Sequence, residues 1–242
     1  MSVIINIEKD QPLEHPQQNL QQLIYGLSHD MGAPLRAVVQ FSLLLSRNLD
    51  AKLNDKERYW LQLIQENGEQ AQSMIAALLQ YSRLETHRET LKPFTIDEAL
   101  QLALRKLQPQ LLETNATIDY VPSACEINGD AEQWQLYFYC VLENALKFHS
   151  PTTDIPPQIR IRIDNTPNTI TICVEDNGIG VNEKHWIELS RPFKRLNRQE
   201  EYPGIGMGLG YCERITQLHG GHLEFSSSPL GGLCITCTLA QA

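Results

Sequence analysis

The sequence predicts an α+β fold in which a long helical hairpin precedes an α/β sandwich, with helices on one side of a sheet. Three observations support this prediction. Apolar residues recur every three or four positions over residues 17–49 and again up to residue 85, as they do in packed helices. From residue 95 onwards, helical and strand patterns are mixed. The 242 residues, 42% of them apolar, suffice for one large domain or two ordinary ones.

The helical part is expected to be an antiparallel hairpin. The first apolar stripe consists of Leu20, Ile24, Leu27, Met31, Leu35, Val38, Ser42, Leu45 and Leu49. The second consists of Leu61, Ile64, Ala71, Met74, Ile75 and Leu78. Only residues 50–54 separate the two helices, which places them side by side. Two helices alone cannot close a core, so we expect two chains to build a four-helix bundle, that is, a homodimer.

The chain is expected to divide into an N-terminal extension (1–16), the helical domain (17–85), a linker (86–94) and a second domain (95–242). Thr95 and Glu98 match a capping box that starts a helix. Helices are expected over residues 96–113, 131–148 (capped by Asp130) and 208–219, with strands near 116–121, 158–164, 169–175, 221–227 and 232–239. This order predicts the α/β sandwich.

Charge and hydropathy exclude several classes of function. The net charge of −9 leaves no basic surplus, which argues against a nucleic-acid partner. No apolar run reaches the ~18 residues that a membrane span requires, and the first residues lack the order of a signal peptide. We therefore expect a cytoplasmic protein that does not enter a membrane.

Six cysteines are scattered along the chain. Cys234 and Cys237 have CxxC spacing, but in a strand these two positions point to opposite faces, and no second pair completes a zinc site. We expect structural thiols, with metal or redox use as the alternative.

His29 is a candidate nucleophile. It lies two residues after Leu27 and two before Met31, so it points away from the apolar stripe. Taken alone, an exposed helical histidine is most often an ordinary surface residue. The adjacent carboxylate of Asp30, however, can fix the imidazole tautomer and leave one ring nitrogen free. Pro34 removes a backbone donor and should bend the helix nearby.

Asn144 and Lys147 lie three residues apart on one expected helix, so they share a face. The amide oxygen suits Mg²⁺, and the ammonium group suits phosphate oxygens. A plain polar helix face is the alternative for this pair alone.

Asp176 follows an apolar strand and precedes Gly178 and Gly180. A carboxylate accepts hydrogen bonds only, which suits an exocyclic amino group such as that of adenine. The glycines let the backbone approach a flat ligand. A hairpin turn is the simple alternative, because Asn-Gly is a turn signal.

The last glycine cluster contains Gly204, Gly206, Gly208 and Gly210 and opens directly into a helix. The unpaired N–H groups at such a helix start favour anionic phosphates. A basic segment precedes this cluster and contains Arg191, Phe193, Lys194, Arg195 and Arg198. We expect this segment to be a lid over a nucleotide, with a solvated loop as the alternative.

In this order the motifs resemble those of sensor histidine kinases of two-component signalling. Ser28-His29-Asp30 with Pro34-Leu35-Arg36 resembles the H box, Asn144–Phe148 the N box, Asp176–Gly180 the G1 box, Arg191–Leu196 the F box and Gly204–Leu209 the G2 box. The resemblance covers about residues 17–240. It implies a dimerisation and phosphotransfer hairpin, followed by an ATP-binding domain of the gyrase, Hsp90, kinase and MutL type.

The resemblance also implies ATP and Mg²⁺ as cofactors and a role for each matching residue. His29 would be the phosphoacceptor, Asp30 its activating base, Asn144 a Mg²⁺ ligand, Lys147 a phosphate contact and Asp176 the adenine anchor. The remaining nucleotide-binding positions would be Phe148, Gly178, Gly180, Phe193, Arg195, Gly204, Gly206, Gly208, Leu209 and Gly210.

The chain departs from the family pattern at Ala33 and Cys140, and in a minor way near residues 231–234, which lack the usual Ser or Thr. Ala33, four residues after His29, stands where many such kinases have Thr or Asn, and it cannot position a water through its side chain. This departure counts against phosphatase activity. Cys140 replaces a second Asn and is a poor ligand for the hard Mg²⁺ ion, so the metal would rely on Asn144, water and phosphate.

No sensor or receiver domain is visible in the sequence. About 16 residues precede the first helix, too few for a ligand-binding domain. We expect the signal to come from a separate sensor protein, unless the chain is a fragment. Stand-alone kinases associated with haem nitric-oxide sensors are similar in size, which makes such a sensor one candidate.

The resulting hypothesis is Mg-ATP-dependent autophosphorylation of His29, within or across the dimer. Transfer to an aspartate in the receiver domain of a response regulator would follow. One alternative is a catalytically degenerate nucleotide-binding scaffold that regulates a partner through its bundle, and Cys140 favours it. A plain ATPase is a second alternative, against which His29 and its hairpin argue.

Overall fold

The computed structural model describes residues 16–86, 91–150, 154–197 and 201–241. Within these ranges, the side chains of residues 16–23, 25, 27, 29, 85 and 86 are not described. The chain forms two compact units, Met1–Arg83 and Leu84–Ala242, which are treated one at a time below. Among the described residues, none of the helices combines the length and hydropathy required to cross a bilayer.

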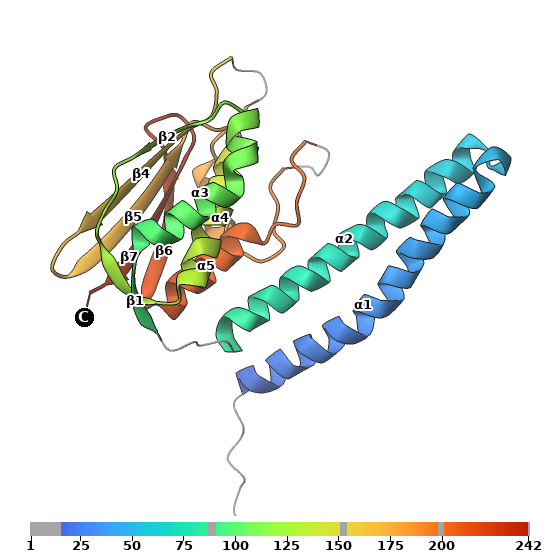
Figure 1. Cartoon of the computed structure of the whole chain (residues 1–242), viewed down its shortest axis with the longest axis horizontal. Helices are drawn as coiled ribbons and strands as arrows, with labels where there is room; N and C mark the ends of the chain where they lie inside the picture. The colour runs from blue at the N-terminus through green and yellow to red at the C-terminus, as the bar shows by residue number, and fades with distance from the viewer. Residues whose placement is uncertain (1–15, 87–90, 151–153, 198–200, 242) are drawn as a thin grey trace, which may run out of the picture. The chain divides into compact units, whose positions relative to one another are not determined.

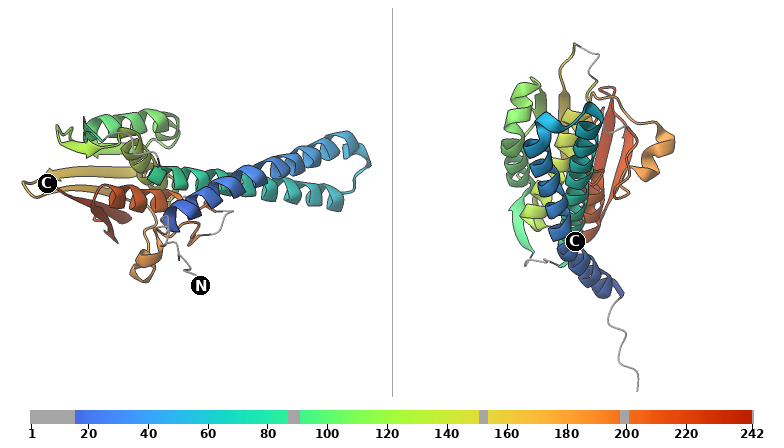
Figure 2. Two further views of the ribbon diagram at one scale, coloured as in Figure 1. Left: turned by 90° about the horizontal axis from the view of Figure 1, so that it is seen from below. Right: turned by 90° about the vertical axis from the view of Figure 1, so that its right-hand side faces the viewer.

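The first unit is a helical hairpin, as the sequence predicts. Its elements are α1 (Pro16–Leu49), the short 3-10 helix η1 (Asp50–Lys52) and α2 (Asp55–Thr86). The two long helices run alongside each other from the connecting turn (Figures 1 and 2). α1 continues through Pro34 as a single helix.

Local hydrogen bonds explain where α2 begins. The side chain of Asn54 accepts from the Glu57 N–H at 3.0 Å, and the Glu57 carboxylate accepts from the Asn54 N–H at 2.8 Å. This reciprocal pair satisfies two N–H groups at the helix start. Arg58 also donates to the backbone oxygen of Asp50 at 2.7 Å, which ties the turn to α2.

The packing of α1 corrects the predicted single stripe. Val39 and Ser42 are buried against α2, and a Cβ atom added at Gly68 of α2 would lie 2.5 Å from Val39 Cγ2. By contrast, Met31, Val38 and Leu45 are about half exposed, at 50%, 47% and 48%. The same holds on α2, where Ile64 and Met74 are 46% and 37% exposed. Each helix therefore has two apolar faces, of which only one packs within the hairpin.

The second unit is an α/β sandwich. Its main sheet has five strands in the order β2-β4-β5-β7-β6: Thr117–Tyr120, Gln158–Asn165, Thr169–Asp176, Leu233–Ala240 and Gly221–Ser227. β2 and β4 pair in parallel, and all other neighbours pair antiparallel. The helices α3 (Ile96–Glu113), α4 (Ala131–Lys147) and α5 (Gly208–Leu218) lie together on one face (Figure 1).

The core of this unit lies between α4 and the sheet. Trp134, Tyr137 and Phe138 are fully buried on α4, and Ile172 is fully buried on β5. Aromatic side chains of this size bury large apolar areas and dominate core energetics. The core therefore fixes α4, and with it the polar residues near its C-terminal end.

Two helix starts confirm the sequence predictions. Thr95 and Glu98 form the complete capping box of α3. Asp130 caps α4 by accepting from the N–H groups of Glu132 and Gln133 at 2.9 and 3.2 Å.

The second unit contains three short elements that were not predicted from the sequence. β1 (Lys92–Thr95) pairs antiparallel with β3 (Glu126–Gly129) in a separate two-stranded sheet, and a 3-10 helix, η2, spans Glu183–Glu188. The predicted linker was therefore wrong at its C-terminal end, whereas residues 87–90 lie outside the described part of the chain. Pro93 lies inside β1, and a proline counts against a strand in a sequence-based prediction.

Candidate functional site

Asp176 is a nearly buried carboxylate at the end of β5, with 9% of the residue exposed. Its Oδ1 atom accepts from the backbone N–H groups of Gly178 at 2.8 Å and Leu233 at 3.0 Å. Burial raises the pKa of Asp176, while the two backbone donors and the imidazole of His149 act in the opposite direction. The backbone thus fixes the carboxylate in an orientation in which it can accept from a ligand.

Glycines leave no room for side chains around Asp176. A Cβ at Gly178 would lie 2.7 Å from the Phe148 backbone oxygen, and a Cβ at Gly232 would overlap the Asp176 carboxylate. Gly180 has a φ of +64°, in the left-handed region that favours glycine. The backbone therefore lies close to the Asp176 carboxylate at this turn, and its approach to a flat ligand stays a prediction.

The C-terminal half of α4 faces the last glycine cluster. A Cβ at Gly208 would lie 3.5 Å from Asn144 Nδ2 and 3.6 Å from Cys140 Cβ, and one at Gly204 would lie 2.8 Å from Lys147 Nζ. The structure therefore brings together the predicted N-box and G2-box residues, which are 60 positions apart in the sequence.

The start of α5 presents backbone donors to the same place. Its N-cap residue, Met207, makes no side-chain capping hydrogen bond, and the first turn contains no acidic residue. The N–H groups of Gly208, Leu209 and Gly210 therefore keep the donor capacity and the positive helix end that attract phosphate.

Two cations add to this positive region. Burial lowers the pKa of Lys147, and the nearby Arg195 lowers it further, whereas Glu143 raises it. Arg195 donates to the Tyr202 backbone oxygen at 2.8 Å, and the Tyr202 ring lies 5.1 Å from that of Phe148. A bound anion would relieve the repulsion between Lys147 and Arg195.

The predicted lid is folded but partly neutralised. Lys194 forms a 3.0 Å ion pair with Glu188, and Arg191 lies 3.6 Å from the same carboxylate. Phe193 has a φ of +61°, a strained conformation for a side chain of this size. A Cβ at Gly206 would lie 2.6 Å from the Lys194 backbone oxygen, so this glycine packs directly under the lid. Arg198 lies outside the described residues.

The predicted phosphoacceptor motif lies on the hairpin. His29 is part of α1, but its side chain lies outside the described part of the structure; Asp30 is exposed. A cavity of about 510 Å³ lies beside this motif, between Ser28, Gly32 and Arg36 of α1 and Gln72 and Leu79 of α2. The roles of His29 and Asp30 stay predictions.

Several residues of the site were not predicted from the sequence. They contribute in four ways, through the Leu233 N–H, the Gly232 backbone, the His149 imidazole and the Tyr202 ring. The tandem Gly231-Gly232 at the start of the last strand was the available signal, since paired glycines mark a close backbone approach.

The fold and this arrangement of groups define a nucleotide-binding α/β sandwich attached to a helical hairpin. Comparison with known proteins gives the same result. Residues 129–242 match the family model "Histidine kinase-, DNA gyrase B-, and HSP90-like ATPase". Residues 19–87 match the "His Kinase A (phospho-acceptor) domain".

Relatives and solved structures agree with these matches. Cyanobacterial phytochrome A of Nostoc is 30% identical over 89% of this chain, and the circadian input-output histidine kinase CikA of Synechocystis is 30% identical over 91%. The chain spans only 28% and 30% of the length of these relatives. The full-length ShkA structure in complex with AMPPNP has a TM-score of 0.63 at 21% identity, over 92% of this chain and 46% of that one.

The Acinetobacter baumannii histidine kinase AdeS has a TM-score of 0.58 at 15% identity, over 85% of this chain and 94% of that one. At these identities the two structures show the fold alone. With both domain families present, the chain belongs to the histidine kinase family.

Proposed function

We propose that this chain uses ATP to phosphorylate His29 and then transfers the phosphoryl group to an aspartate of a response regulator. One observation carries the nucleotide half of this proposal. A buried carboxylate, an Asn-Lys helix face and an uncapped helix start converge within one folded unit.

The groups present fit each part of ATP. Backbone donors already occupy the Oδ1 atom of Asp176. Its other carboxylate oxygen would accept a hydrogen bond from the adenine amino group. Lys147, Arg195 and the N–H groups at the start of α5 would hold the phosphates. Phe193 and the lid would exclude water.

Asn144 would supply the one protein oxygen for Mg²⁺, which commonly keeps several waters and phosphate ligands. Cys140 lies beside Gly208, where a soft sulfur adds nothing to binding of a hard ion. When bound, the ion neutralises charge on the phosphates.

His29 would act as the nucleophile of the phosphoryl transfer. One ring nitrogen would form the new bond to the γ-phosphorus as the bond to the β,γ-bridging oxygen breaks, with ADP as the leaving group. Asp30 would hold the proton on the other ring nitrogen. Positioning and charge stabilisation account for most catalysis of this reaction type.

The wider assignments belong to the same proposal. Histidine kinases generally dimerise and signal to response regulators, and we propose a cytoplasmic homodimer with phosphotransfer over residues 17–85 and catalysis over residues 95–242. A separate sensor, such as a haem nitric-oxide sensor, stays a prediction from sequence resemblance.

Incubation with γ-labelled ATP and Mg²⁺ tests the proposal. The protein should acquire acid-labile, alkali-stable label, which both His29→Ala and Asn144→Ala should abolish. His222→Ala is the matched control, because His222 is exposed on β6 away from the site, and it should label normally. A receiver domain added afterwards should remove the label from His29.

The degenerate scaffold is the alternative that a specific observation favours, namely Cys140 in the metal-binding region. It predicts nucleotide binding without label on His29. Phosphate release that survives His29→Ala would instead indicate a plain ATPase.

A further inference from the structure

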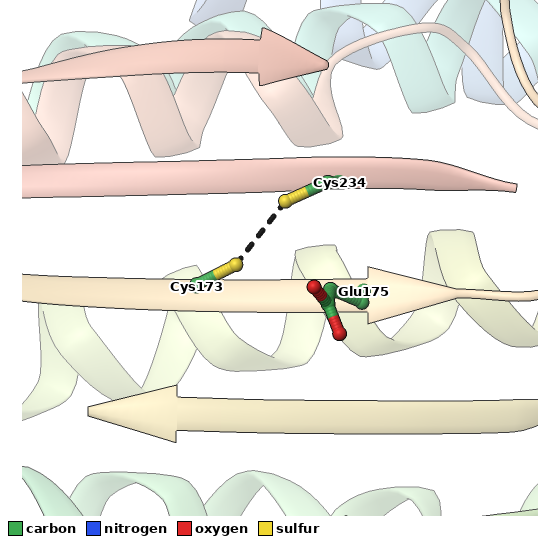
Figure 3. A group of neighbouring side chains, drawn as sticks. All are labelled: Cys173, Glu175 and Cys234. Carbon is green, nitrogen blue, oxygen red and sulfur yellow. Dashed lines mark hydrogen bonds between the residues drawn. The ribbon is translucent and has the colours of Figure 1, made fainter. Parts of the chain in front are cut away.

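Two thiols and a carboxylate form a group outside the nucleotide site. Cys173 and Glu175 lie on β5, and Cys234 lies on the neighbouring β7 (Figure 3). The two sulfurs are 3.1 Å apart. One ligand atom from each residue lies within 4.8 Å of the others. Figure 3 shows the sulfurs pointing toward each other across the two strands, with the helices behind the sheet.

This group differs from the CxxC pair in the sequence. The two cysteines of that pair lie on opposite faces of β7. Cys237 is fully buried in the core on one face, and Cys234 pairs with Glu175 of β5 on the other. Strand alternation therefore separates Cys234 from Cys237, as predicted, and sheet pairing supplies Cys173 as a new partner. Cys173 and Cys234 are 61 residues apart in the sequence, so no local spacing could show this pair.

The strand register favours a bridging ion over a disulfide. Cys173 lies opposite Thr236, so Cys173 and Cys234 are diagonal neighbours. Diagonal Cα atoms lie roughly 7–8 Å apart, whereas disulfides usually need a Cα separation of about 4.4–6.8 Å. An ion with two metal–sulfur bonds of about 2.3 Å holds the sulfurs roughly 3.8 Å apart in a tetrahedral site, which this pair can reach by small side-chain rotations.

Glu175 is oriented in the way that a ligating carboxylate requires. Only 8% of the residue is exposed, and its Oε2 atom accepts from Arg160 at 3.4 Å. Arg160 is itself held by Asp119 at 2.9 Å. Such outer hydrogen bonds fix the orientation of metal ligands, and the second carboxylate oxygen stays available to an ion.

We propose that Cys173, Glu175 and Cys234 bind a divalent cation of borderline or soft character, with Zn²⁺ as the representative ion. Thiolates select such ions over Mg²⁺ and Ca²⁺. Each coordinating thiol loses its proton to solvent, so up to two protons are released per ion. Cys173 is partly exposed, which leaves a path for entry and for a water as fourth ligand.

Spectroscopic titration of the 242-residue chain with Co²⁺ tests this proposal without reference to kinase activity. In a thiol-free reductant, one Co²⁺ per chain should produce a sulfur-to-cobalt charge-transfer band and the intense visible bands of a tetrahedral site. One equivalent of Zn²⁺ should abolish both signals. The affinity should weaken as the pH falls, because protons compete with the ion.

Matched cysteine variants locate the site. Cys173→Ser and Cys234→Ser should each weaken binding more than about a hundredfold, since even outer-shell changes cost 10–100-fold. Glu175→Gln should weaken binding while keeping the charge-transfer band. Cys237→Ser, in the same strand but on the opposite face, should bind like the unaltered protein.

Three outcomes would overturn the proposal. The first is a charge-transfer band that persists in the Cys173→Ser, Cys234→Ser double variant. The second is a wild-type protein that shows no such band. The third is oxidation to a Cys173–Cys234 disulfide, seen by peptide mass spectrometry, in protein that retains no metal. If a variant fails to fold, alkylation of the wild-type protein decides the matter, because Zn²⁺ should slow modification of Cys173.

Discussion

At the scale of single residues, the Asp176 carboxylate is the proposed contact for adenine in the second unit. Its Oδ1 atom is occupied by two backbone donors, so Oδ2 is the acceptor available for a ligand. Burial raises the cost of its charge, and the glycines beside it let the backbone approach it closely. A carboxylate whose charge is costly, and which the backbone holds in one orientation, is typical of a functional site.

Asp176→Asn should weaken ATP binding roughly tenfold to a hundredfold. The amide oxygen can still accept from Gly178 and Leu233, so the fold should survive, but the amide NH₂ group cannot accept from adenine. A hydrogen bond to a charged group contributes about 1.5–3 kcal/mol, which corresponds to this range. Isothermal titration calorimetry with ATP measures the effect, and Asp164→Asn, at an exposed position of β4, is the matched control. Equal affinities of the two variants for ATP would show that Asp176 does not contact the nucleotide.

Lys147 shows how the site depends on its surroundings. Its pKa is lowered mainly by burial and also by Arg195, so the folded chain holds two cations together at a cost in stability. Phosphate oxygens placed between them would offset that repulsion, because opposite charges favour the protonated form. The unfavourable pairing in the free protein thus favours binding of a polyanion.

At the scale of elements, Gly68 and Val39 set how closely α1 and α2 approach. Alanine is favoured over glycine in a helix interior by about 1 kcal/mol. At Gly68 the added Cβ would overlap Val39, and overpacking of this kind costs typically 1–3 kcal/mol. Gly68→Ala should therefore reduce the hydrogen-exchange protection of α2, measured by mass spectrometry of peptides from that helix.

Two further variants make this prediction specific. Gly26→Ala, at a helical position with open space around it, should raise protection or leave it unchanged. Val39→Ala combined with Gly68→Ala should restore protection relative to Gly68→Ala alone. A Gly68→Ala chain with protection equal to the Gly26→Ala chain would show that this contact does not limit packing.

His219 links the end of α5 to the start of α4. Its Nε2 atom accepts from the Asp130 N–H at 3.3 Å, and its Nδ1 atom lies 2.8 Å from the Ile215 backbone oxygen. Nε2 can accept only in the neutral ring, and burial lowers the pKa of His219. The unfolded chain therefore binds a proton at a higher pH than the folded chain does.

The stability of this unit should consequently fall as the pH decreases below the ordinary histidine value of about 6.5, by at most about 1.4 kcal/mol per pH unit from this group. Urea unfolding followed by Trp134 fluorescence measures it, in a background with Trp60→Phe and Trp186→Phe. His219→Gln should flatten the dependence, whereas His222→Gln, at an exposed position, should not. An identical pH profile in both variants would assign the dependence to other groups.

Long periodic elements were predictable from the sequence, and contacts between distant elements were not. The capping residues Thr95 and Asp130 identified the starts of α3 and α4, because capping is a local signal. The pairing of β5 with β7 depends on the whole fold. The sequence therefore contains no local signal for the hydrogen bond from the Leu233 N–H to Asp176. The motif residues Asn144 and Lys147 were predictable as a pair, yet their approach to Gly204 and Gly208 required the tertiary structure.

At the scale of the whole molecule, the hairpin displays an apolar face that it does not use itself. Phe41 is 64% exposed on α1, next to the half-exposed Val38 and Leu45, and Trp60 is 51% exposed on α2. Contiguous exposed apolar side chains of this kind mark association surfaces. Their spacing along both helices matches that of a four-helix bundle made from two hairpins.

Val38→Glu combined with Leu45→Glu should convert the proposed dimer into monomers. Four carboxylates would then lie within one bundle core, where unpaired buried charge is costly. Light scattering coupled to size-exclusion chromatography should give about twice the 27.5 kDa of one chain for the unaltered protein and the mass of one chain for the variant. Gln40→Glu combined with Arg47→Gln, both at exposed positions of α1, lowers the net charge by the same two units outside this face and should leave the dimer intact. A variant that keeps the dimeric mass would place the dimer contacts elsewhere and leave this apolar face without the partner proposed for it.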